Sequence, residues 1–109
     1  RKNVEFELAA FGMIGLESCF GVFNTAADGK LDVTSVVEKI AHNPRKILGL
    51  ETPAIEEGAR ANFTLFDPEQ KWTFGESDLR SKSRNTPFLG MELTGRALGI
   101  FNRGELQTC

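Results

Sequence analysis

The stretch SKSRNTPFLG, residues 81–90, decides how the chain is interpreted, because its composition indicates a turn whereas a strand pattern follows it directly. Apart from Phe88 and Leu89, its residues are polar, basic, proline or glycine, a composition typical of turns. It runs directly into MELTGRALGIFN, residues 91–102, which has the character of a strand. Three interpretations are open: a basic loop that binds phosphate, a disordered linker, or an ordered crossing between two elements.

The first half of the chain has the periodicity of helices. Met13, Leu16, Phe20 and Phe23 recur at three- and four-residue steps, which predicts one amphipathic helix over residues 13–27.

A second helix is predicted over residues 33–41, with Asp32 in the position of its N-cap. A third, short helix follows, with Asn43 as cap, Pro44 at the first helical position and Gly49 at the end.

The second half has the period of strands. Apolar and polar residues alternate around the motif DPEQ, residues 67–70, which is a turn signal, and Gly58 marks an earlier tight turn. NRGE, residues 102–105, is a hairpin signal after a strand at residues 96–102. Helices first and strands second predict an α+β fold, with strand positions at Phe63, Leu65, Trp72 and Phe74.

Composition excludes several classes of protein. The chain has 109 residues, enough for one domain that buries roughly two-thirds of its unfolded surface. Its 40% apolar and 26% charged residues are typical of a soluble globular protein, and its net charge of −2 argues against nucleic-acid binding. No apolar run approaches the roughly 20 residues of a membrane span, and the start does not resemble a signal peptide, so we expect a cytoplasmic protein without a membrane partner.

The chain offers few ligands for a metal or groups for nucleophilic catalysis. It has one histidine and two cysteines, too few for a zinc site of the usual kind. We expect His42 to lie beside a helix terminus, where an imidazolium interacts favourably with the carbonyl end. Cys19 lies in an apolar helical pattern and is expected to be a buried, reduced thiol, and no disulfide framework is expected.

Gly12 and Gly15 are the glycines with a candidate function. Their spacing fits neither a dinucleotide fingerprint nor a phosphate loop. If the predicted helix starts beside Gly12, its open amide protons suit an anion. The alternative is that both glycines only permit close packing. Glu17 is interpreted as a carboxylate that favours the helix dipole, and Lys82 and Arg84 as cations of a solvated loop.

Three stretches taken together resemble the dihydroorotases, of the amidohydrolase superfamily, in their C-terminal portion. AAFGMIGLES, residues 9–18, resembles the family's Phe-Gly-x-x-Gly-Leu-Glu-Thr run, with Ser18 in the place of Thr. Residues 41–74 are similar to its Asn-Pro-Ala-x-Ile-Leu-Gly-Leu and Asp-Pro-x-x-x-Trp sequences, with Arg45 and Asn62 as departures from the pattern. Residues 81–88 are similar to its closing Ser-Lys-Ser-x-Asn-Thr-Pro-Phe segment, so the ordered crossing becomes the preferred interpretation.

The resemblance implies that the parent is a zinc-dependent (β/α)₈ barrel that reversibly cyclises N-carbamoyl-L-aspartate to dihydroorotate. Since a barrel takes about 250 residues, this chain would hold its last loop and C-terminal helices in residues 1–50 and the C-terminal half of its small β-domain, in short antiparallel strands, in residues 51–109. The family's metal ligands and catalytic residues match nothing here. Phe11 and Gly12 match its substrate-contacting Phe-Gly, so we expect them to bind substrate through the backbone.

Two rival interpretations remain. The first is that the chain is a non-catalytic interaction module or a pseudo-enzyme. The second is that it is part of a related hydantoinase or allantoinase. Taken as a dihydroorotase portion, it is expected to be inactive alone, to bind no zinc itself, and to self-associate through helix faces that lack the barrel.

Overall fold

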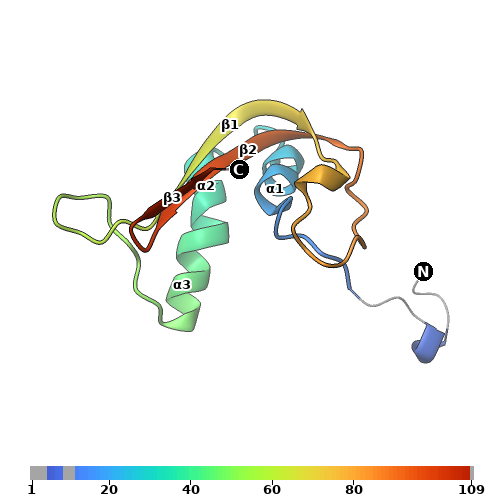
Figure 1. Ribbon diagram of the computed structural model, residues 1–109, viewed down its shortest axis with the longest axis horizontal. Coiled ribbons are helices and arrows are strands. Elements are labelled where there is room, and N and C mark those ends of the chain that lie inside the picture. The colour runs from blue at the N-terminus through green and yellow to red at the C-terminus, as the bar shows by residue number, and fades with distance from the viewer. Residues whose placement is uncertain (1–4, 9–11, 109) are drawn as a thin grey trace.

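The computed structural model describes residues 5–8 and 12–108 and contains helices followed by one antiparallel sheet (Figure 1). The predicted α+β order is therefore confirmed. The elements are η1 (Phe6–Leu8), α1 (Cys19–Ala27), α2 (Val33–Val37), η2 (Glu38–His42), α3 (Asn43–Leu48), β1 (Phe63–Thr73), η3 (Glu76–Asp78), β2 (Glu92–Asn102) and β3 (Glu105–Thr108).

The sheet has the strand order β1-β2-β3, and its two long strands arch over the helices in Figure 1. Phe63 pairs with Phe101 at one end of the β1–β2 ladder, and Thr73 pairs with Glu92 at the other. The turn from β2 to β3 places Arg103 and Gly104 at φ values of 52° and 81°. Positive φ at both central residues is the signature of a tight hairpin turn, so the hairpin predicted at NRGE is confirmed.

The turn predicted at DPEQ is wrong, because β1 continues through residues 67–70. The motif instead interrupts the ladder, and the pairing register shifts between Asp67 and Lys71. Pro68 has no N–H to give to the ladder, and the Asp67 carboxylate accepts the Glu69 N–H at 2.9 Å. A proline and a local side-chain bond thus produce a bulge within one long strand rather than a reversal of the chain.

Residues 33–48 form one continuous helical run, not two separate helices. Its start is as predicted, because the Asp32 carboxylate accepts the Ser35 N–H at 2.9 Å, and so is its end at Gly49, with φ of 67°. Asn43 is not a cap, since its N–H bonds to the Glu38 carbonyl in a π turn. A proline ring clashes with the carbonyl four residues earlier, so widening the helix just before Pro44 lets the run continue.

The first helix starts later than predicted, at Cys19 instead of residue 13. Met13 and Leu16 lie outside it, with 60% and 90% of their surface exposed. The Ile14 N–H bonds to the Asn85 carbonyl at 3.0 Å, so this part of the chain is paired with a distant segment instead of coiling. The expected buried thiol is also wrong, because Cys19 is free but exposed.

The face of α1 that meets the sheet combines small and polar residues with Phe20, whose ring lies 4.8 Å from that of Phe66. A Cβ atom on Gly21 would lie 3.0 Å from the Gly95 carbonyl oxygen and 3.2 Å from the Leu93 side chain. A Cβ atom on Gly95, whose φ is 102°, would lie 2.9 Å from Phe20. The helix therefore approaches β2 closely because both contact positions lack side chains.

Hydrogen bonds fix α1 at this close distance. The Asn24 side-chain amide donates to the carbonyls of Pro68 and Thr94 at 3.0 and 2.9 Å. The Thr94 N–H in turn donates to the Thr25 hydroxyl at 2.8 Å. One asparagine thus joins α1 to the bulge of β1 and to β2.

We predict that Asn24→Asp lowers the free energy of unfolding by about 1–3 kcal/mol, because a carboxylate cannot donate to the two carbonyls. Urea denaturation of the 109-residue chain measures this value. Asn62→Asp, at an exposed position, is the matched control and should change stability by less than about 0.5 kcal/mol. Equal losses in the two variants would contradict the assignment.

Candidate functional site

The candidate substrate-binding pair falls partly inside the described structure. Gly12 is described and exposed, whereas Phe11 lies outside the described residues. Because α1 begins only at Cys19, Gly12 is not at a helix start, and that part of the expectation is wrong. A Cβ atom on Gly12 or on Gly15 would meet nothing within 4 Å, so close packing does not explain either glycine in this structure.

Asn85 holds the backbone that follows Gly12. Its side-chain amide donates to the Gly12 carbonyl at 2.6 Å, and its own carbonyl accepts the Ile14 N–H at 3.0 Å. The two contacts fix consecutive peptide groups of the glycine segment. Two of the stretches that carry the family resemblance, residues 9–18 and 81–88, therefore meet in space although 73 residues separate the bonded pair.

Glu17 makes the second contact between the same two segments. Its Oε1 accepts the backbone N–H groups of Arg80 and Ser81 at 3.0 and 2.6 Å and the Ser81 hydroxyl at 2.7 Å. These bonds, that from the Ser81 hydroxyl above all, lower the pKa of Glu17 from 4.5 to about 2. Glu17, which lies two residues before α1, is thus an ionised acceptor for the distant segment and does not serve only the dipole of that helix.

We call the paired residues 12–17 and 80–85 the glycine junction. The core supports the glycine junction through residues 86–90, which follow it in the sequence. The Gly90 N–H donates to the carbonyl of Phe74 at 2.7 Å, and the Phe74 side chain is only 1% exposed. Phe88 is half-buried, and the Phe74 N–H donates to the Met91 carbonyl at 3.0 Å. Residues 81–90 are therefore an ordered crossing between η3 and β2, as the resemblance indicates.

The two cations of the crossing have no shared ligand-binding geometry. Lys82 and Arg84 are exposed, and Arg84 lies 4.0 Å from Glu76 in an ion pair whose side chains are both more than half exposed. Such pairs contribute little to stability. The interpretation of these cations as part of a solvated loop agrees with this arrangement.

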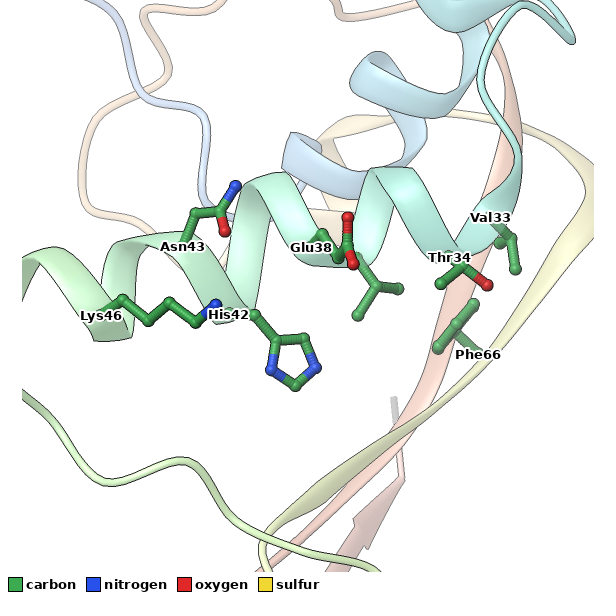
Figure 2. A pocket seen from close by; sticks show the side chains of 8 residues that line it. Val33, Thr34, Glu38, His42, Asn43, Lys46 and Phe66 are labelled. Atoms are coloured by element: carbon green, nitrogen blue, oxygen red, sulfur yellow. The ribbon is translucent and has the colours of Figure 1, made fainter.

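A groove of about 430 Å³ lies elsewhere, between the helical run and β1. Figure 2 shows the His42 ring extending from the helical run into the groove, with Phe66 of β1 across from the start of the run. His42 lies inside the run rather than at its terminus, so the position expected for it is wrong. The other polar residues of the lining are Thr34, Glu38, Asn43 and Lys46.

Residues 5–8 and 12–108 contain no group of three or more His, Cys, Asp or Glu side chains that could hold a metal ion. Within the same residues, no helix is long and apolar enough to cross a membrane.

Sequence reasoning missed Asn85 and misassigned Glu17. Both contacts join residues more than 60 positions apart, and periodicity reports only neighbours along one element. The available signal was the composition of SKSRN, where Ser83 accepts the Asn85 N–H at 3.1 Å in a local turn. That signal identifies an ordered turn but not its distant partner.

The fold and the glycine junction define a small α+β unit in which residues 12–17 are hydrogen-bonded to the segment that leads into β2. Comparison with known proteins makes the class specific. The chain is 47% identical over 90% of its length to a dihydroorotase of Chlorobaculum tepidum. It is 42% identical over 96% to the dihydroorotase of Caldicellulosiruptor saccharolyticus and 38% identical over 97% to that of Elusimicrobium minutum.

The chain is therefore related to the dihydroorotases, and the resemblance inferred from its motifs is confirmed. It spans only about a quarter of the relatives' length, 23% of the first and 25% of the other two. No protein-family profile matches it.

Glu17 gives the junction a definite pH dependence. Its folded pKa of about 2 lies below the ordinary 4.5, so its contribution to stability is complete above pH 4.5 and is lost as the pH falls towards 2. We predict that Glu17→Gln lowers the free energy of unfolding by about 1–2 kcal/mol at pH 7 and that the difference from wild type shrinks across this window.

Denaturant titrations of both chains at pH 7, 4 and 2.5 measure the difference. Glu105→Gln, at an exposed position of β3, is the control and should change stability by less than about 0.5 kcal/mol at pH 7. A Glu17→Gln difference that stays constant from pH 7 to 2.5 would show that the carboxylate charge is not what the junction uses.

Proposed function

We propose that this chain is the C-terminal part of an enzyme that reversibly cyclises N-carbamoyl-L-aspartate to dihydroorotate in pyrimidine biosynthesis. The observation that carries the proposal is identity of 36–47% to relatives named dihydroorotase across most of the chain. The junction adds support, because two motifs of the resemblance lie against each other in one hydrogen-bonded unit.

Within that enzyme, we place Phe11 and Gly12 at the substrate. Their proposed function is to offer backbone hydrogen bonds to the anionic and amide groups of the substrate from a loop at the catalytic end of a (β/α)₈ barrel. Residues 1–50 would supply the last loop and the C-terminal helices of the barrel, and residues 51–109 half of the small β-domain. Exposure of Gly12 and the free space around it support this placement.

The zinc that the resemblance implies does not fit the described residues of this chain, which contain no cluster of three ligands. No step of the reaction is therefore assigned to a metal held here. The 109-residue chain is proposed to be inactive alone, and its contribution is limited to positioning the substrate. The expected cytoplasmic location stays a prediction.

The test compares the complete polypeptide that contains this sequence with residues 1–109, each supplied with zinc. We predict cyclisation of N-carbamoyl-L-aspartate by the complete polypeptide only. Turnover by the 109-residue chain would disprove its inactivity. A complete polypeptide that does not turn over this substrate but hydrolyses the ring of hydantoin or allantoin would favour the related cyclic amidohydrolases. A complete polypeptide without any turnover would favour a non-catalytic module.

A glycine substitution tests the assigned contact in the same assay. Gly12→Ala should fold normally because a Cβ atom meets nothing within 4 Å, but its methyl group should raise KM about tenfold by crowding the substrate. Gly15→Ala, where a Cβ atom is equally free, is the matched control and should leave KM unchanged.

Apolar side chains on and after α3 support the proposed self-association of the isolated chain. Ile47 is 83% exposed, Leu48 70% and Ile55 91%. Large exposed apolar patches mark interaction surfaces between proteins. We predict a mass above that of one chain in light scattering at high concentration, and a monodisperse monomer would contradict the prediction.

A further inference from the structure

We propose that Asn85 is a positioning residue: it does not contact the substrate, but it holds the backbone at Gly12 in the conformation that binds the substrate. This inference rests on the proposed function of Gly12. It concerns how that segment keeps its conformation.

Packing does not hold Gly12 in place. The residue is exposed, a Cβ atom on it would meet nothing within 4 Å, and Met13 beside it is 60% exposed. A glycine without surrounding side chains has wide backbone freedom, and ordering it costs free energy when the substrate binds. Within the described residues, the contacts that hold this segment are hydrogen bonds.

Asn85 supplies those bonds at two successive peptide groups. Its side chain fixes the Gly12 carbonyl at 2.6 Å, and its main-chain carbonyl fixes the Ile14 N–H at 3.0 Å. These groups lie on either side of Met13, so rotation about the Met13 backbone bonds is restricted, and the peptide group that follows Gly12 is held in one orientation. The segment reaches the substrate with its conformation already set, which reduces the ordering cost of binding.

Asn85 is itself held by contacts that lead back to the sheet. Ser83 accepts its N–H at 3.1 Å, and the Thr86 N–H donates to the Arg84 carbonyl at 2.9 Å. Beyond Thr86, the half-buried Phe88 and the bond from the Gly90 N–H to the Phe74 carbonyl tie the crossing to the core. At the other end of the junction, the Ser81 N–H and hydroxyl donate to the Glu17 carboxylate.

The decisive variant is Asn85→Asp in the complete polypeptide. It keeps the shape of the side chain but places a carboxylate oxygen where an N–H faced the Gly12 carbonyl. Since the backbone of Gly12 contacts the substrate in both the ground state and the transition state, KM for N-carbamoyl-L-aspartate should rise about tenfold while kcat changes less than about twofold.

Arg84→Ala is the matched control in the same segment, because its side chain is exposed and touches no atom of residues 12–17 through a hydrogen bond or ion pair in the described structure. It should leave KM and kcat within about twofold of wild type. Asn85→Ser, which shortens the side chain but keeps the main-chain carbonyl for Ile14, is the second variant and should also raise KM.

The outcomes separate this inference from the proposed function. An active wild-type polypeptide whose KM is unchanged in both Asn85 variants overturns the positioning function alone. Failure of both variants to fold also overturns it, because Asn85 would then serve stability only. A wild-type polypeptide without turnover overturns the proposed function of the chain, and with it the premise of this inference.

Discussion

The close approach of α1 to β2 is the constraint on which the rest of the structure depends. Gly21 and Gly95 leave no room for a Cβ atom between the helix and the strand, and Asn24 bonds the helix to both long strands. With α1 fixed there, Glu17 at its N-terminal side lies within hydrogen-bonding distance of Ser81. The position of residues 12–17 therefore depends on how α1 packs against the sheet.

The sheet contributes to this arrangement through two irregularities. The bulge at Pro68 exposes a carbonyl that accepts from Asn24, and Gly95 takes a φ of 102° in the middle of β2. Trp72 then donates its indole N–H to the Gly95 carbonyl at 2.9 Å, and the Arg96 guanidinium lies over the same ring. Interruptions of regular pairing are frequent next to functional positions, and here they provide the attachment points of the helix.

Much of the architecture was predictable from local patterns. The NRGE turn, the Asp32 cap and the Gly49 stop each depend on neighbours along the chain, and each was placed correctly. The alternation was only partly correct, because β1 runs through DPEQ and ends at Thr73, one residue before Phe74. The predictions were wrong where a contact between residues far apart in the sequence outweighed the local pattern. Residues 13–18 have helical periodicity, but hydrogen bonds to residues 80–85 hold them outside the helix.

The candidate site shows the same division. The motif resemblance identified Gly12 and the SKSRNTPF segment as separate features, but their contact depends on tertiary structure that no single-sequence pattern reports. For Glu17, the helix-dipole argument used only local geometry, whereas its pKa is lowered mainly by a serine 64 residues away. Family resemblance supplied the identity, and the structure supplied the physical connection between its motifs.

In the proposed enzyme, the glycine junction presents to the substrate a backbone segment whose conformation is already set. The most direct test is a crystal structure of the complete polypeptide with dihydroorotate bound. We predict that the backbone of residues 11–12 lies within hydrogen-bonding distance of the ligand while the Asn85 amide still donates to the Gly12 carbonyl. A ligand bound away from residues 11–12, or a Gly12 carbonyl released from Asn85 in the complex, would contradict it.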